Sequence, residues 1–340
     1  MPRGRARRSR RAAVFDRELV KRLTGTVRPT KLEPSRAEGW VDSVVRTGKV
    51  AVLAPMNALQ TDPARVPVRE DGIPPAAWGR RTFIMGILNV TPDSFYDGGR
   101  HNAPEAAEEL ARRMEEDGAD WIDIGGESSR PGAVPVVEAE ELRRLLPVIE
   151  RVRSSTRIPI SVDTAKSSVA RAALAAGATW VNDIWGLQGD PEMAGVIASA
   201  GASVVVMHNR RSREYPEGLV AAIKSYFEAA LEIAARAGIA RERIVLDPGI
   251  GFGKTPQQSL AVLRQLAEFR SFGLPLLLGA SRKSVIGHVL DLPPAERLEG
   301  SLATTVMAVA AGFDAVRVHD VRAHVRAARM ADAVYRGHHG

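Results

Sequence analysis

The sequence predicts an α/β protein, a (β/α)8 TIM barrel that follows a basic N-terminal extension. From Thr82 onward, eight short apolar runs alternate with amphipathic stretches rich in Ala, Glu, Arg and Leu, and strands that alternate with helices pair in parallel. The eight units fill residues 82–336, which are 255 residues, close to the roughly 250 typical of this barrel. We therefore expect an extension at 1–80 and a barrel at 81–340.

Each expected strand is an apolar run between two helical stretches. In chain order these runs are 83–88, 121–124, 158–161, 180–184, 203–207, 243–247, 275–279 and 315–319. The clearest expected helices are 104–118, 138–152 and 220–238, and Pro147 is expected to kink or interrupt the second of them. Glycine is expected to end four helices just before a strand, at Gly118, Gly177, Gly201 and Gly312.

The alternative fold is a doubly wound open sheet. That fold usually carries a Gly-rich turn after its first strand, and none is present here. The stretch 247–255 is not a phosphate loop, because Pro248 stands where the GxxxxGK pattern needs glycine. The barrel is therefore preferred.

Composition excludes several classes of protein. The chain has no cysteine, which excludes disulfides, thiolate metal sites and a cysteine nucleophile. No apolar run reaches the ~18 residues that a membrane span needs. We therefore expect no membrane partner.

The extension is expected to be partly disordered. Residues 1–22 hold eight Arg and one Lys against Asp16 and Glu18, so they carry the whole net charge of +7. Three interpretations remain open: a solvated arm or an early start codon, a weak contact with nucleic acid or another anionic surface, and an organelle transit peptide. Because a secretory signal is lacking, we expect a cytoplasmic protein whose barrel does not bind nucleic acid.

Polar residues gather where the expected strands end, which is where barrel active sites lie. They are Asn89, Asp123, Asp163, Asn182, Asp183, His208, Asp247, Arg317 and His319, with Lys283 shortly after the seventh strand. Capping alone does not account for so many, so the set indicates an active site. Individually, Asp123 and Asp183 are equally well explained as turn or cap residues, His208 as a local hydrogen-bonding residue, and Asp320 as the N-cap of the last helix.

The residue types narrow the chemistry of this site. No Glu-x-x-His pattern or His cluster suits zinc, and no serine has an evident activating partner. What remains is an acceptor set and a basic set, namely Asp163, Asn182 and Asp247, and Arg130, Lys283, Arg317 and His319. Buried carboxylates need donors, which the N–H edge of a flat heterocycle supplies, and the cations suit a diphosphate.

Seven stretches carry a resemblance to a known family. They read ILNVTPDSFYDGG (87–99), DIGGESSRPGA (123–133), SVDT (161–164), VNDI (181–184), LDPGIGFGKT (246–255), GASRKS (279–284) and RVHDV (317–321). In this order they resemble the motifs of dihydropteroate synthase, a family of pterin-binding (β/α)8 barrels. The resemblance implies condensation of (7,8-dihydropterin-6-yl)methyl diphosphate with 4-aminobenzoate in folate biosynthesis. It also implies Mg²⁺ as cofactor, a homodimer, and displacement in which diphosphate leaves before the arylamine attacks.

The resemblance also implies roles for single residues. Asp163, Asn182 and Asp247 would hold the amino-pyrimidinone edge of the pterin, with Lys283 at its carbonyl, Arg317 stacked over the ring and Met207 lining the pocket. Arg317, His319, Asn89 and Ser129 would bind diphosphate, with Asn89 as the Mg²⁺ ligand. Arg130, Pro131 and Ser284 would seat the aminobenzoate, and the catalytic set would be Lys283, Arg317, His319 and Arg130.

Some features depart from the family or lie outside it. Position 129 is Ser where many members have Thr, and 209–215 lacks a Gln-Gly often found there, which puts contacts from that loop in doubt. The loops 90–102 and 126–136 are expected to be flexible in the free enzyme and to close over the ligands. A pterin-dependent methyltransferase and a non-catalytic pterin-binding paralogue are the alternatives. The GGESSRPG loop and the SRK motif favour the synthase, since a methyltransferase has no diphosphate to bind.

Overall fold

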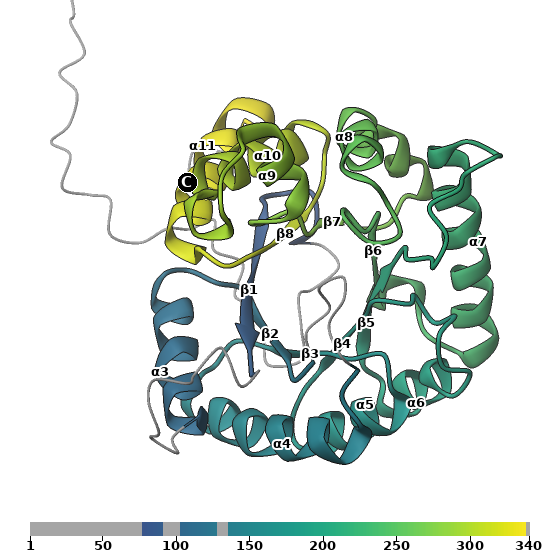
Figure 1. Cartoon of the computed structure of the whole chain (residues 1–340). Coiled ribbons are helices and arrows are strands. Elements are labelled where there is room, and N and C mark those ends of the chain that lie inside the picture. Colours follow the sequence, from purple (N-terminus) through teal and green to yellow (C-terminus); the bar gives the residue numbers. More distant parts are fainter. Residues whose placement is uncertain (1–76, 91–102, 128–134, 338–340) are drawn as a thin grey trace, which may run out of the picture. The chain divides into compact units, whose positions relative to one another are not determined.

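Eight parallel strands form the barrel of this chain (Figure 1). The structure, a computed structural model, describes residues 77–90, 103–127 and 135–337. The strands are β1 (Phe83–Asn89), β2 (Trp121–Gly125), β3 (Ile160–Asp163), β4 (Trp180–Asp183), β5 (Ser203–Met207), β6 (Ile244–Asp247), β7 (Leu277–Leu278) and β8 (Ala315–Val318). Their order is β6-β5-β4-β3-β2-β1-β8-β7. A parallel bridge between Leu246 and Leu276 joins the two outer strands, so the expected barrel is confirmed.

Helices surround the strands on the outside (Figure 1). They are α3 (Ala103–Glu116), α4 (Glu138–Ser155), α5 (Ser167–Ala175), α6 (Met193–Ala200), α7 (Leu219–Ala237), α8 (Pro256–Arg264), α9 (Ser284–Leu290), α10 (Leu298–Ala310) and α11 (Val321–Tyr335). Short 3-10 turns lie at Arg241–Arg243, Leu266–Phe272 and Pro294–Glu296. The expected helices at 104–118, 138–152 and 220–238 correspond to α3, α4 and α7.

Local signals placed most element ends, with two differences. Pro147 does not interrupt α4, whose buried face of Leu145, Val148, Ile149 and Val152 holds the helix together through it. The four expected C-terminal glycines all have positive φ, the left-handed conformation that glycine adopts without a Cβ clash. Asp320 occupies the N-cap position of α11, but its side chain makes no capping bond and instead pairs with Arg282. The expected N-cap position is therefore confirmed, although the side chain forms an ion pair instead of capping the helix.

Alternation along the strands divides the core into two layers. Residues such as Ile84, Leu88 and Ile122 face the helices, whereas their neighbours face the barrel axis. The axial layer contains Phe83, Met85, Trp121, Trp180, Val205, Val245, Leu277 and Ala315. The Trp121 and Trp180 rings stack with centroids 5.6 Å apart. This apolar layer fills the barrel beneath the C-terminal strand ends.

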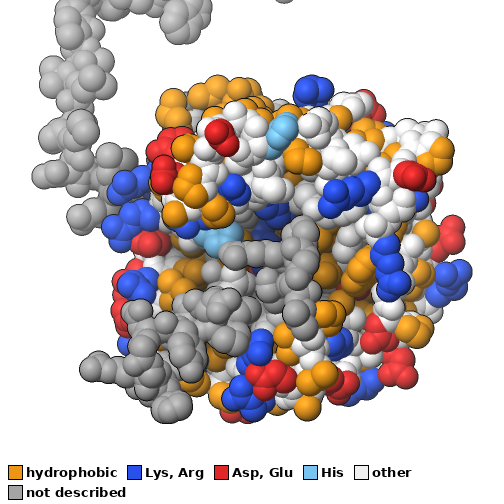
Figure 2. Space-filling view, viewed as in Figure 1, with side chains coloured by type: hydrophobic (Ala, Val, Ile, Leu, Met, Phe, Trp, Pro, Cys, Tyr) orange, Lys and Arg blue, Asp and Glu red, His pale blue; other side chains and the backbone are white. Residues whose placement is uncertain are grey.

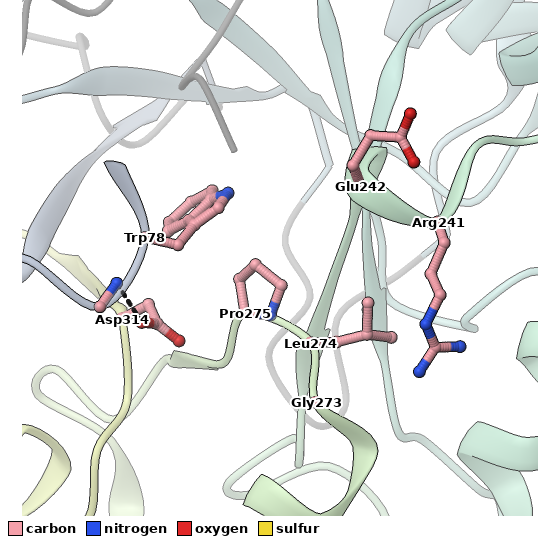
Figure 3. Close-up of a pocket in the computed structure, with 8 residues that line it drawn as sticks. Trp78, Arg241, Glu242, Gly273, Leu274, Pro275 and Asp314 are labelled. Atoms are coloured by element: carbon pink, nitrogen blue, oxygen red, sulfur yellow. Dashed lines mark hydrogen bonds between the residues drawn. The ribbon is translucent and has the colours of Figure 1, made fainter. Parts of the chain in front are cut away.

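The N-terminal end of the barrel is closed by the segment that leads into β1. Trp78 packs edge-on against Phe83, with ring centroids 5.0 Å apart. A cavity of about 510 Å³ beside it is lined by Trp78, Gly79, Arg241, Glu242, Gly273, Leu274, Pro275 and Asp314 (Figure 3). The Asp314 carboxylate accepts the backbone N–H groups of Gly79 and Leu276, at 2.9 and 3.0 Å. The polar groups of this cavity therefore hold chain segments together. The candidate active site lies at the other end of the barrel, where the strands have their C-terminal ends.

Candidate active site

The strand periodicity brings one polar layer together above the axial apolar layer. Side chains two residues apart on a strand share a face. Asp123 therefore follows Trp121 inward, Asn182 follows Trp180, and the same step leads from Val245 to Asp247, from Val205 to Met207 and from Ala315 to Arg317. Figure 2 shows Lys and Arg atoms recessed near the middle of the face it draws.

Arg317 and Asp123 form the centre of this layer. Asp123 is fully buried, and its Oδ2 accepts hydrogen bonds from Arg317 Nε at 2.6 Å and Asn182 Nδ2 at 2.9 Å. Arg317 Nη2 also donates to Asp163 Oδ2 at 2.8 Å. One guanidinium therefore links the ends of β2, β3 and β8, and one carboxylate orients both Arg317 and Asn182.

Burial favours the protonated, neutral form of the Asp163 carboxyl group. It raises the pKa of this carboxyl to about 7, with the Arg317 guanidinium opposing the rise and the Asp123 carboxylate adding to it. Arg317 thus keeps two neighbouring carboxylates in one small volume. A ligand that donates N–H groups finds acceptors in this layer.

Asp247 and Lys283 form the opposite wall. Asp247 is buried, and its Oδ1 accepts the Gly249 N–H at 2.8 Å. Gly279 lies beside both groups, because a Cβ atom there would lie 3.4 Å from Asp247 Oδ2 and 3.6 Å from Lys283 Nζ. Burial raises the pKa of Asp247 and lowers that of Lys283 to about 8, and each charge opposes the shift of the other. Lys283 Nζ lies 4.6 Å above the centre of the Phe252 ring.

Asn89 and His319 lie at the rim of this layer. A Cβ atom on Gly125 would lie 3.7 Å from Asn89 Oδ1 and 3.6 Å from Asp163 Oδ2, so the Asn89 amide lies beside the acceptor layer. His319 Nδ1 and Ser281 Oγ are 3.0 Å apart, and the His319 backbone N–H donates to the same oxygen. The rim therefore joins an amide oxygen, an imidazole and a hydroxyl.

The structure brings most of the expected site residues together. Asp163, Asn182, Asp247, Met207, Lys283 and Arg317 share the polar layer or border it, while Asn89 and His319 lie at its rim and Ser284 begins α9. Ser129, Arg130 and Pro131 lie outside the described residues, as do most of the loops 90–102 and 126–136.

The structure separates residues that looked alike in sequence. Asp123 belongs to the polar layer, whereas the Asp183 carboxylate accepts the backbone N–H groups of Trp185 and Leu187 and stabilises a turn. The alternation of side chains along a strand could have distinguished the two residues. Asp123 lies two residues after inward-facing Trp121 and so also faces inward, whereas Asp183 lies three residues after Trp180 and faces the other way. His208 Nδ1 contacts Lys254 Nζ, a residue that the sequence did not single out.

Comparisons with known proteins identify the family. Residues 85–319 match the pterin binding enzyme family, and the chain is 49% identical to dihydropteroate synthase of Bacillus subtilis over 267 residues, covering 78% of this chain and 93% of the relative. The chain belongs to the pterin-binding enzymes, among the dihydropteroate synthases. The prediction of this family, and of an enzyme of folate biosynthesis, is thereby confirmed.

Solved structures of the family agree with the fold. The dihydropteroate synthase from Clostridium difficile, solved in the presence of pteroic acid, is 52% identical with a TM-score of 0.75, covering 76% of this chain and 98% of its own. The Xanthomonas albilineans dihydropteroate synthase with 4-aminobenzoic acid is 42% identical with a TM-score of 0.73, and the match covers 76% of this chain and 96% of that one.

Among the helices that the structure describes, none is both long and apolar enough to cross a membrane.

Proposed function

We propose that the chain condenses (7,8-dihydropterin-6-yl)methyl diphosphate with 4-aminobenzoate to give 7,8-dihydropteroate and diphosphate. The observation that carries the proposal is the buried polar layer, in which carboxylate and amide acceptors face two cations, Lys283 and Arg317. The amino-pyrimidinone edge of a pterin presents N–H donors beside a carbonyl, which is the complement of such a layer. Relatives in this family have been solved with pteroic acid, 4-aminobenzoic acid and 7,8-dihydropteroate.

In this proposal the inner layer holds the pterin. Asp163, Asn182 and Asp247 accept its N–H groups, Lys283 donates to its carbonyl side, Arg317 stacks on the ring and Met207 lines the pocket. Asp123 stays beneath the ligand and keeps Arg317 and Asn182 in place through the bonds at 2.6 and 2.9 Å. Recognition therefore depends on acceptors whose own orientation is fixed, which lowers the ordering cost of binding.

The rim binds the reacting ends of the two substrates. Asn89, Ser129, Arg317 and His319 contact the diphosphate, and Arg130, Pro131 and Ser284 seat the aminobenzoate. The bond from the pterin methylene to diphosphate breaks with its electron pair on oxygen, and the ring delocalises the positive charge. The arylamine nitrogen then forms the new C–N bond and loses a proton to solvent. The Arg317 guanidinium acts where negative charge develops on the departing diphosphate.

The residues present fit Mg²⁺ bound with the help of substrate. Asn89 supplies an amide oxygen beside the polar layer, and hard cations prefer oxygen ligands. Within the described parts of the chain, no group of three or more His, Asp and Glu side chains could hold a metal ion. Asn89 and the diphosphate oxygens would share the ion, and its charge would neutralise the leaving group.

A second copy of the chain would cover the apolar face of α10 and α11. These two helices pack on each other and expose five large apolar side chains, Val306, Met307, Met330, Val334 and Tyr335, between 37% and 68% accessible. Large apolar side chains that stay exposed on two packed helices favour a protein interface. A homodimer is therefore proposed, and light scattering on the purified chain would measure its mass.

One assay tests the proposed reaction. Purified protein is incubated with Mg²⁺ and the pterin diphosphate, with and without 4-aminobenzoate, while diphosphate and dihydropteroate are measured. We expect release that depends on 4-aminobenzoate, and a fall of about 100-fold in kcat/KM in Asp247→Ala, because an unpaired buried group costs ~1–3 kcal/mol or more with charge. Release without 4-aminobenzoate, or none with folded protein, would contradict the proposal.

A further inference from the structure

The loop between β6 and α8 is built around a buried lysine. Lys254 is 3% exposed, and its Nζ lies 2.7 Å from His208 Nδ1, 2.9 Å from the Gly249 carbonyl oxygen and 3.0 Å from that of Phe252. An ammonium group has three N–H donors and no acceptor, so these three acceptors match it one to one. The side chain thus acts as an internal cation within its own loop.

His208 connects this cation to the neighbouring loop. It follows β5, is 1% exposed, and lies edge-on to the Tyr226 ring with centroids 4.8 Å apart. Burial, together with the Lys254 charge, lowers the pKa of His208 to about 2, so the ring is neutral and Nδ1 accepts from Lys254. Burial also lowers the pKa of Lys254 to about 7, while the Asp247 carboxylate opposes that fall. Lys254 therefore joins the loops after β5 and β6.

The carbonyls that Lys254 holds belong to residues that shape the pterin pocket. Gly249 donates its N–H to Asp247 Oδ1 at 2.8 Å, and a Cβ atom there would lie 2.0 Å from the His208 carbonyl oxygen. Its φ of +68° also requires glycine. Phe252 presents its ring 4.6 Å from Lys283 Nζ. Through these two residues, the position of Lys254 sets the surroundings of both Asp247 and Lys283.

We propose that Lys254 is a positioning residue of the pterin pocket. It lies behind the pocket wall and fixes the loop 248–254 to His208, which keeps the wall in place. It touches no substrate in this arrangement and acts through the Gly249–Asp247 hydrogen bond and the placement of Phe252. The inference rests on the proposed function, since it assigns the pterin to the Asp247 wall. It predicts that loss of the cation weakens pterin binding while the barrel stays folded.

Pterin affinity measured by calorimetry tests this, with 6-hydroxymethylpterin as the probe. Lys254→Met keeps the length of the stem and removes the donors, and we expect at least tenfold weaker binding. Lys224→Met is the matched control, because Lys224 pairs with Glu268 beyond the pocket, and we expect affinity within threefold of wild type. Steady-state kinetics should show the loss mainly as a higher KM for the pterin substrate rather than a lower kcat.

Coupling to Asp247 distinguishes positioning from general destabilisation. Asp247→Ala removes the acceptor of the Gly249 N–H. In that background Lys254→Met should weaken binding by a clearly smaller factor than in wild type, because one of its two routes to the pocket is already lost. His208 offers a second pair of variants that leaves Lys254 in place. His208→Asn keeps an acceptor near the Nδ1 position and should stay within threefold of wild type, whereas the similarly sized His208→Leu should lose at least tenfold.

Two results would overturn the inference. One is full additivity of Lys254→Met with Asp247→Ala, and the other is equal pterin affinity in His208→Asn and His208→Leu. The second comparison still decides the matter if Lys254→Met does not fold. Wild-type protein that fails to bind 6-hydroxymethylpterin would instead remove the proposed pterin site itself, whereas binding that is unchanged across these variants would remove only the role of Lys254.

Discussion

Replacing Asp123 by Asn tests whether one buried carboxylate orients the pterin pocket. The side chain keeps its shape and loses its charge. In the native protein, its Oδ2 accepts from Arg317 Nε at 2.6 Å and from Asn182 Nδ2 at 2.9 Å. An amide oxygen can still accept, but the bond to the guanidinium is no longer assisted by charge on both partners. Arg317 is then held by Asp163 alone and is expected to shift toward it.

The size of the effect follows from these bonds. Hydrogen bonds to charged groups contribute about 1.5–3 kcal/mol each, and Asp123→Asn weakens one of them and leaves the second less well oriented. We expect a loss of about 2–3 kcal/mol in transition-state stabilisation, which is roughly a 30- to 150-fold fall in kcat/KM for the pterin substrate. Arg317, which already donates to Asp163, would bind it more closely and compete with the pterin for that carboxylate, so most of the fall should appear in KM.

Asp183→Asn is the matched control. Asp183 ends strand β4 and is 1% exposed, but its oxygens accept only the backbone N–H groups of Trp185 and Leu187 among the contacts described. We expect this variant to lower the melting temperature and to keep kcat/KM within about threefold of wild type. Steady-state kinetics and thermal unfolding on both variants give the comparison. Equal losses of kcat/KM, or an unchanged value in Asp123→Asn, would refute the assigned role of Asp123.

Three further predictions concern pH and inhibition. Since burial lowers the pKa of Lys283 to about 8, the ammonium donor is lost above that pH. We expect kcat/KM to fall about tenfold per pH unit above pH 8 in wild type and not in Lys283→Arg. The same fall in Lys283→Arg would show that another group causes it. His324 is 1% exposed beside Thr305 Oγ1, and burial lowers its pKa from 6.5 to about 4. Its folded pKa lies below the unfolded one, so its contribution is full above pH 6.5 and is lost as pH falls toward 4. The unfolding free energy of wild type should therefore fall relative to His324→Gln by up to about 3 kcal/mol over that window, measured by urea titration. A constant difference would contradict this, because it would mean that His324 has the same pKa in the folded and unfolded states. A relative from Yersinia pestis has been solved with a sulfonamide drug; we expect a sulfonamide to compete here with 4-aminobenzoate in initial-rate inhibition kinetics, and competition with the pterin substrate would contradict two separate pockets.

Much of the site could be predicted because its positions follow from local periodicity. Asn182 and Asp247 each lie two residues after an inward apolar residue on a strand, and barrel strands present their last inward residues to the active-site end. The turn chemistry of Gly118, Gly177, Gly201 and Gly312 is equally local, and all four have the positive φ that was expected. Family motifs then supplied the roles.

The sequence by itself therefore determined the parallel barrel, the strand ends that carry the site and the family. Only the tertiary structure decided which groups pair: Arg317 meets Asp123 and Asp163 across 194 and 154 residues, and Lys254 meets His208 across 46. Strand and helix signals act between residues a few positions apart, whereas these pairs form only when β1 lies between β2 and β8 and β5 lies beside β6. Such partners depend on strand order and burial, which short-range patterns do not encode.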